Sequence, residues 1–200
     1  MSILRTFDMP LDIDGKAAVH TSGLAWDGVN LWGVDFKSNL AYCIDLERSL
    51  TDSQPTINGY FDTTLNGTIA CCFVDFQDTR YLAISDFMNS CNTIFVQVDI
   101  ALEENTAKNA VKFSYRNEGF SQGLEFIDGY LWESENKIGI DIINKMDLAV
   151  LEETRDARRS TVTQFNAPSK MVEDLAWDGE FMWTSDESDF SFYRCRCDSQ

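Results

Sequence analysis

Histidine, basic side chains and long apolar runs are the scarce features of this sequence. His20 is the only histidine among 200 residues, and a single imidazole cannot build a typical zinc site. No segment approaches the ~20 apolar residues that span a bilayer, and residues 1–15 lack the apolar run of a secretory signal. No glycine-rich phosphate loop, nucleophile elbow or zinc-protease motif occurs. These absences predict a cytoplasmic protein with no membrane partner, redox cofactor or covalent nucleophile.

Acidic side chains outnumber basic side chains throughout the chain. The 33 Asp and Glu residues against 16 Lys and Arg give a formal net charge of −17. Binding to nucleic-acid phosphates is therefore disfavoured. A small cationic ligand, a metal ion or a basic partner is favoured, and solubility or a saline habitat is the alternative reason for the acidity. In the cytoplasm the six cysteines are expected to be buried or edge thiols, because Cys71-Cys72 and Cys195-x-Cys197 lack zinc-site spacing.

A short phrase recurs four times. The first copy is Gly23-Leu24-Ala25-Trp26-Asp27-Gly28 followed by Leu31-Trp32-Gly33-Val34-Asp35. Two further copies span 123–135 and 174–186, and a degraded copy spans 71–86. The acids that close the copies are spaced by 49 to 51 residues; they are Asp35, Asp86, Glu135 and Asp186. A period of about 50 residues that fills the chain predicts a repeat architecture.

Each copy predicts two strands joined by a tight hairpin, often with an Asp-Gly turn. Third strands are expected at 40–45, 93–99, 142–147 and 192–197, and fourth strands at 56–61, 111–115 and 161–165. The charged connections 101–110 and 148–159 are expected to be solvated segments or short helices. The last repeat has no fourth strand of its own before Gln200.

A strand at the other terminus can complete the last repeat. Residues 3–8 match the fourth strands at 57–62 and 162–166. This permutation closes the ring of a β-propeller and leaves few open edges, whereas a stack of sheets would leave the N-terminal strand unexplained. We therefore predict an all-β, single-domain, four-bladed β-propeller. Its blades are 18–63, 64–116, 117–166, and 167–200 together with 2–8.

One repeat carries a family resemblance. Phe120-Ser121-Gln122-Gly123-Leu124-Glu125-Phe126 and Leu131-Trp132-Glu133-Ser134 resemble the T-Q-G-L and L-Y/F-E-S runs of the glutamine cyclotransferase (plant-type glutaminyl cyclase) family. The resemblance covers about 30 residues, or one blade. It implies a propeller fold and places that family's catalytic glutamate on Glu133. Members of that family are secreted and five-bladed, with this motif near the N-terminus.

The four closing acids are predicted to share one face of the ring with the segments that enter the innermost strands. Ligands of propellers usually occupy this face around the axis, so we expect an acidic ligand face. The alternative is structural: acids at a strand end accept backbone N–H bonds from the following turn.

Two glutamates break the pattern of the repeat. Counting back from the hairpins pairs 25 with 32, 24 with 33, and 22 with 35. The 25/32 slot holds one small and one large residue in the pairs Ala25/Trp32, Phe73/Ala83 and Ala176/Trp183, but Glu125 faces Trp132. Position 33 is Gly, Ile or Thr elsewhere and Glu133 in the third repeat. A poorly hydrated carboxyl has a raised pKa and suits acid/base catalysis, so both are candidate catalytic residues; solvation or pairing with a basic residue is the alternative.

Other candidates lie on the presumed ligand face. His20 can move protons and is a further catalytic candidate. Gln122, Trp132, Ser22 and Glu173 are candidate substrate-binding residues. Glu173 is expected opposite Asp186, where an oxygen-rich pair could bind Ca²⁺.

Two functions remain open from the sequence. The first is a small enzyme of cyclase, isomerase or lyase type that handles an amine-bearing substrate with carboxylate acid/base groups. The second is a non-catalytic propeller that binds a small ligand, a metal or a basic protein. Fold alone does not decide between them, and the oligomeric state is open.

Overall fold

The computed structural model describes residues 20–52, 55–88, 92–137 and 140–196. The strand predicted at residues 2–8 lies outside these residues and stays a prediction. The described part of the chain contains no helix that is long and apolar enough to cross a membrane.

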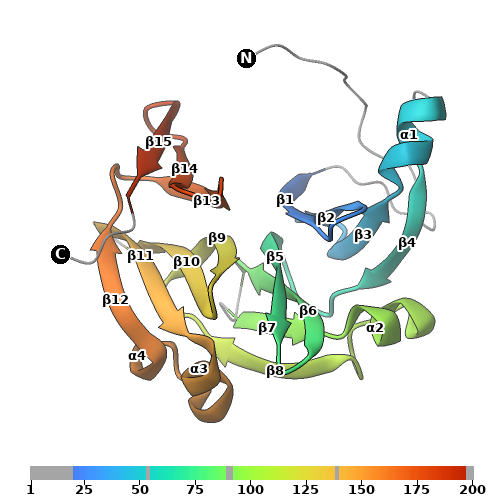
Figure 1. Cartoon of the computed structure of the whole chain (residues 1–200), viewed down its shortest axis with the longest axis horizontal. Coiled ribbons are helices and arrows are strands. Elements are labelled where there is room, and N and C mark those ends of the chain that lie inside the picture. The colour runs from blue at the N-terminus through green and yellow to red at the C-terminus, as the bar shows by residue number, and fades with distance from the viewer. Residues whose placement is uncertain (1–19, 53–54, 89–91, 138–139, 197–200) are drawn as a thin grey trace.

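Four antiparallel sheets surround an axis, which makes the fold a four-bladed β-propeller (Figure 1). Blade 1 comprises β1 (Thr21–Trp26), β2 (Leu31–Asp35), β3 (Leu40–Ile44) and β4 (Ile57–Asp62). Blade 2 comprises β5 (Thr68–Phe76), β6 (Thr79–Asp86), β7 (Asn92–Val96) and β8 (Val111–Arg116). Blade 3 comprises β9 (Phe120–Ile127), β10 (Tyr130–Lys137), β11 (Ile140–Asp147) and β12 (Thr161–Asn166). Blade 4 comprises, among the described residues, β13 (Val172–Trp177), β14 (Met182–Asp186) and β15 (Ser191–Cys195).

Short helices connect the third and fourth strands of blades 1 to 3 at the rim of the ring (Figure 1). They are α1 (Leu46–Asp52), α2 (Val98–Glu104), α3 (Leu148–Thr154) and α4 (Ala157–Ser160). The predicted strand 93–99 ends at Val96, because α2 begins at Val98. Asp147 and Asp156 cap α3 and α4 by accepting backbone N–H bonds. Helix α1 was not expected from the sequence.

The innermost strands pack directly on one another, β1 on β5, β5 on β9 and β9 on β13. Glycine permits this close approach at two places. A side chain at Gly23 would meet the Ile69 carbonyl oxygen at 2.8 Å, and one at Gly123 would meet the Leu175 nitrogen at 2.6 Å. Both glycines of the repeated phrase are therefore required by contact between blades.

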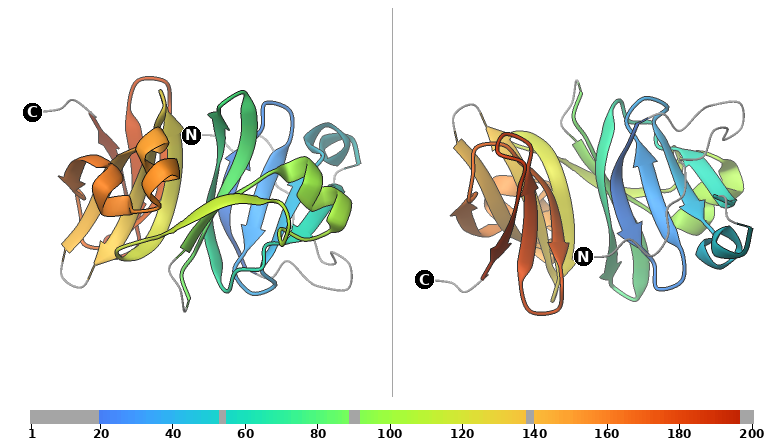
Figure 2. Two further views of the ribbon diagram at one scale, coloured as in Figure 1. Left: turned by 90° about the horizontal axis from the view of Figure 1, so that it is seen from below. Right: turned by 90° about the horizontal axis from the view of Figure 1, so that it is seen from above.

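Apolar clusters fill the interfaces between successive blades. One joins blades 1 and 2 around Trp32, the next joins blades 2 and 3 around Phe95, and another joins blades 3 and 4 around Trp132. The seam between blades 4 and 1 differs, because Leu24 and Trp26 on β1 are 54% and 51% exposed. Seen from above, blades 4 and 1 lie side by side as separate sheets (Figure 2).

A β-bulge changes the predicted register in every blade. The pairs 25/32 and 24/33 are confirmed, but the pair 22/35 is wrong because Thr21 lies opposite Asp35 and Ser22 is the extra residue. The equivalent bulges contain the residues Ile69, Gln122 and Glu173. In blade 2 the predicted pair Phe73/Ala83 is also wrong, because Cys72 lies opposite Ala83.

Candidate functional site

The two exceptional glutamates of blade 3 lie on opposite faces of its sheet. Glu125 is opposite Trp132, whereas Glu133 is opposite Leu124. A Glu125 oxygen accepts a hydrogen bond from the Trp177 nitrogen of blade 4 at 3.1 Å. A Glu133 oxygen accepts one from the Tyr115 hydroxyl of blade 2, also at 3.1 Å. Because one carboxyl faces blade 4 and the other faces blade 2, the two glutamates belong to separate sites.

Glu133 lies within a buried polar cluster between blades 2 and 3. Its side chain is 0% exposed, and the described residues give no hydrogen-bond partner to its Oε1 atom. Two buried atoms on the facing side of blade 2, Ser85 Oγ and Asn117 Nδ2, likewise have no hydrogen-bond partner among the described residues. Buried polar atoms normally find partners, so this cluster has the character of a site for a ligand or ordered water.

The electrostatics of the cluster favour a protonated carboxyl. Burial raises the pKa of Glu133 well above its usual range, the charge of Glu135 adds to this, and hydrogen bonding to Ser121 and Tyr115 opposes it. Burial likewise raises the pKa of Tyr115, so that its hydroxyl keeps its proton as a donor. A carboxyl that titrates nearer neutrality can both give and accept a proton.

Ion pairs border the cluster on its solvent side. Lys137 Nζ lies 3.3 Å from Glu135 Oε2 and 3.0 Å from Glu118 Oε2. Arg158 Nε lies 2.8 Å from the other Glu118 oxygen. Glu135 also accepts the Glu118 backbone N–H at 3.0 Å. These contacts, which come from three separate segments, place positive charge beside the buried carboxyls.

Glu125 lines a different site, a cavity of about 390 Å³ where the innermost strands of all four blades meet. Asp174 lines it as well. Burial raises the pKa of both carboxyls, that of Asp174 to about 7, and the charge of Glu125 contributes to the latter. The lining residues come from the later parts of the innermost strands, so this cavity lies towards the hairpin face. The ligand face expected from the sequence, that of the closing acids, is the opposite one.

The four closing acids accept backbone N–H bonds, as the structural alternative predicted. Asp35 accepts from His20, Lys37 and Ser38 at 2.7 to 3.0 Å. Asp186 accepts from the backbone of Met171, Ser188 and Asp189. Asp86 accepts from the backbone of Asn92. Glu135 accepts from the backbone of Glu118, which precedes β9, and not from the following turn. These carboxylates fix the strand ends and the turns beside them.

The predicted pairing of Glu173 with Asp186 is wrong. The bulge places Val172 opposite Asp186, and Glu173 lies within the bulge. Burial works to raise the pKa of Asp186, but hydrogen bonds, including those of Ser169 and Ser188, hold it below its usual range. Burial and nearby carboxylates raise the pKa of Glu173 to about 7. Across the described ranges no three His, Cys, Asp or Glu side chains are grouped to hold a metal ion.

The remaining candidates are distributed over several blades. His20 is exposed, and its ring packs 5.3 Å from that of Phe36 in blade 1. Ser22 donates to the Thr68 carbonyl at 2.8 Å and so joins blades 1 and 2. Trp132 shares the sheet face of Glu125 and stacks on Phe165. Gln122 is buried within the bulge of β9, and its Oε1 atom has no hydrogen-bond partner among the described residues.

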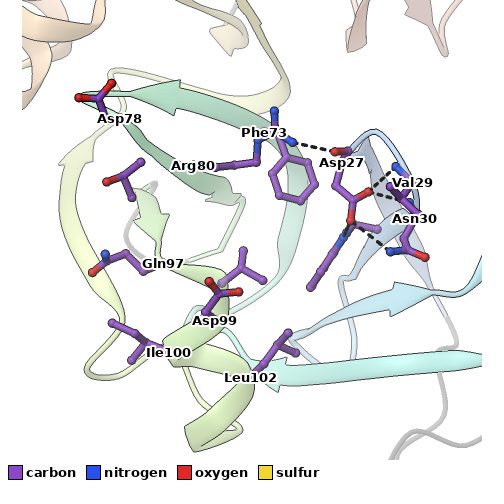
Figure 3. Close-up of a pocket in the computed structure, with 13 residues that line it drawn as sticks. Asp27, Val29, Asn30, Phe73, Asp78, Arg80, Gln97, Asp99, Ile100 and Leu102 are labelled. Carbon is purple, nitrogen blue, oxygen red and sulfur yellow. Dashed lines mark hydrogen bonds between the residues drawn. The ribbon is translucent and has the colours of Figure 1, made fainter.

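A cavity of about 690 Å³ lies between the hairpins of blades 1 and 2 (Figure 3). Arg80 crosses it, donating to both oxygens of Asp75 and to the Asp27 carbonyl, each at 2.7 Å. Asp27 in turn accepts from its own turn and from Trp32 Nε1. Because these groups already satisfy one another, we assign this cavity a structural character.

The cysteines among the described residues are free thiols, as expected. Cys71 belongs to the cluster between blades 1 and 2, and Cys72 to that between blades 2 and 3. Burial raises the pKa of both thiols, which leaves them unreactive core residues.

Comparison with known proteins identifies the fold. No family model and no curated protein matches the chain. A glutaminyl cyclase from Myxococcus xanthus has a similar structure, with a TM-score of 0.60 and 13% identity over 87% of this chain and 71% of its own. Hsv2 from Kluyvelomyces marxianus matches with a TM-score of 0.53 and 7% identity over 90% of this chain and 47% of its own. At these identities the likeness establishes a β-propeller, and the suspected resemblance to glutaminyl cyclases holds at the level of the fold.

Sequence reasoning missed part of both sites. Tyr115 is the aromatic residue of a fourth strand, and its hydroxyl reaches Glu133 only because blades 2 and 3 pack face to face. The grouping of Asp174 with Glu125 arises from two blades and also needs the ring. The one available signal was Asp174 itself, because the equivalent positions hold Gly23, Ala70 and Gly123.

Proposed function

We propose that this propeller is an enzyme of acid/base type in which Glu133 moves a proton for a small, amine-bearing substrate. The observation that carries the proposal is the buried Glu133 carboxyl, which has one unpartnered oxygen and faces two further buried polar atoms, Ser85 Oγ and Asn117 Nδ2, that lack partners among the described residues. Such an arrangement is costly for stability alone and is expected where a ligand completes the hydrogen bonds.

The reaction class that we propose is an intramolecular cyclisation. In the reaction, the amine nitrogen attacks a side-chain amide carbon, a C–N bond forms, and ammonia leaves. Glu133 takes the proton of the attacking amine and returns it to the leaving ammonia, so the carboxyl is unchanged after each turnover. The match of Glu133 to the catalytic glutamate of the resembling family and the shared fold with a glutaminyl cyclase support this class.

The test is ammonia release from a peptide with N-terminal glutamine, followed by mass spectrometry of the cyclised product. Glu133→Gln is expected to lower kcat by about 10² to 10⁴-fold. Glu125→Gln is the matched control, because it makes the same change in the same blade on the other face of the sheet. Equal losses in the two variants, or full activity in Glu133→Gln, would overturn the role of Glu133.

The full burial of Glu133 favours a second candidate function, a binding propeller without turnover. In that case the polar cluster holds a fixed small molecule or ordered water. The expected results are no ammonia release from the wild-type protein and release of a small molecule on denaturation, detected by mass spectrometry.

A further inference from the structure

The axial cavity on the hairpin side is a second site with its own chemistry. All four innermost strands contribute to it: Leu24, Ala25 and Trp26 on β1, Cys71 to Phe73 on β5, Leu124 and Glu125 on β9, and Asp174 to Ala176 on β13. Its volume of about 390 Å³ suits a small ligand. Glu133 faces the other side of the blade 3 sheet, so this cavity does not depend on the function proposed above.

The charged side chains that line this cavity are all acidic. Glu125 and Asp174 line it, and no Lys, Arg or His is among the lining residues. Backbone N–H groups of Phe126 and Trp177 hold the two oxygens of Glu125, at 2.9 and 3.1 Å. The Leu175 N–H holds one oxygen of Asp174 at 2.9 Å. The carboxyls are thus fixed in place, and like charges in a poorly hydrated cavity call for a cation or a proton.

The walls of the cavity select among cations. Leu24, Trp26, Phe73 and Leu175 give it a mainly apolar lining. Ca²⁺ takes six to eight oxygen ligands, which two carboxyls and these walls do not supply. An organic ammonium ion fits better, because its hydrocarbon part can contact the walls and its N–H groups can donate to the carboxylates, with further attraction from aromatic faces.

We propose that the axial cavity binds small organic amines, with the ammonium group between Glu125 and Asp174 and the hydrocarbon part against Trp26 and Phe73. The titratable groups that face the ammonium site are Glu125 on β9, Asp174 on β13 and the Cys71 and Cys72 thiols on β5; none lines it from β1. Because the carboxylate forms bind the cation, affinity rises between pH 6 and pH 8.

The test is calorimetric titration of the full chain with n-butylammonium chloride at pH 8, with n-butanol as the neutral analogue. Butylammonium is expected to bind at least about tenfold more tightly than butanol. Asp174→Asn, which keeps the acceptor for the Leu175 N–H, should weaken butylammonium binding about tenfold and leave butanol unaffected. Asp78→Asn is the control for charge, because Asp78 is an exposed acid of another hairpin.

A second variant guards against misfolding of the first. Ala176→Phe fills the cavity without changing charge and should abolish butylammonium binding. The proposal is overturned if butanol binds as tightly as butylammonium, if Asp78→Asn weakens binding as much as Asp174→Asn, or if the wild-type protein gives no binding heat.

Discussion

Blades 1 and 3 have the same strand arrangement but differ at one position of the second strand, which is Gly33 in blade 1 and Glu133 in blade 3. In blade 1 the slot holds Gly33, and the ring of Tyr42 from the next strand occupies the space, 2.7 Å from where a side chain would begin. The Tyr42 hydroxyl hydrogen-bonds with that of Thr21. In blade 3 the slot holds Glu133, whose Oε1 atom is left without a partner. In blade 1 the Tyr42 ring thus fills this position and its hydroxyl has a hydrogen-bond partner. In blade 3 the Glu133 carboxyl fills it, and one of its oxygens has none among the described residues.

The hairpin of blade 3 also lacks a hydrogen bond that the hairpin of blade 1 has. Trp32 Nε1 donates to Asp27 at 2.8 Å in blade 1, and Trp183 Nε1 donates to Asp178 at 2.7 Å in blade 4. Blade 3 has Ile127 in place of this aspartate, and Trp132 Nε1 has no partner among the described residues. In both comparisons the hydrogen bonds of the repeat are missing in blade 3, which is the blade where we propose the catalytic residue.

Moving the blade 3 residue into blade 1 should have the largest effect. Gly33→Glu would push a carboxyl into the Tyr42 ring and bury it without a partner, so we expect a loss of about 4 kcal/mol in the free energy of unfolding. Urea unfolding measures it. Ser114→Glu, at an exposed strand position, controls for the added charge. A Gly33→Glu protein of wild-type stability would mean that the slots are interchangeable.

The contact between blades 3 and 4 gives the next largest effect. In Gly123→Ala the new methyl group would lie 2.6 to 2.8 Å from backbone atoms of Asp174 and Leu175, which cannot move as a side chain would. We expect a loss of about 3 kcal/mol. Gly28→Ala is the matched control, with positive φ but open space around it, and should cost about 1 kcal/mol. Equal losses would show that the contact with blade 4 is not the reason for glycine at position 123.

The pH dependence of stability should distinguish the two blades. When the pKa of an acid is higher in the folded protein than in the unfolded chain, the acid has no cost for stability at pH values below its unfolded-state pKa. As the pH rises from there towards the folded-state pKa, the free energy of unfolding falls. Burial raises the pKa of Glu133, so Glu133→Gln should melt at a higher temperature than wild type at pH 8, with a smaller difference at pH 5. Thermal melts at both pH values measure this. A difference that does not change with pH would mean that Glu133 does not titrate in this range.

The smallest effect is expected when blade 3 is given the hairpin aspartate that blade 1 has at Asp27. Ile127→Asp offers Trp132 Nε1 the acceptor that Trp32 has, so we expect a gain of about 1 kcal/mol, less the lost apolar contact of Ile127. The reverse change, Asp27→Ile, should destabilise blade 1. Urea unfolding of both variants, with Trp fluorescence, tests the pair. A loss in both would indicate that the hairpins are not equivalent.

The fold could be predicted from the sequence because the same strand–turn–strand pattern occurs four times. The spacing of the closing acids and the small-against-Trp pairs identified four blades and most strand positions. The bulges at Ser22, Gln122 and Glu173 were not accessible, because one extra residue leaves no local signal yet moves each strand start by one place. Glu125 and Glu133 were found as exceptions, but their partners Asp174 and Tyr115 lie on other blades and follow only from the assembled ring.

The close approaches at Gly23 and Gly123 occur only in blades 1 and 3, so the packing around the axis has a two-fold pattern although the ring has four blades. Gly23 lies against Ala70, and Gly123 lies against Asp174, so a residue without a side chain alternates with one that has it. The two docking positions that lack a side chain therefore lie in alternate blades, 1 and 3. Larger residues should be rejected at 23 and 123, where a side chain would meet backbone atoms of the next blade.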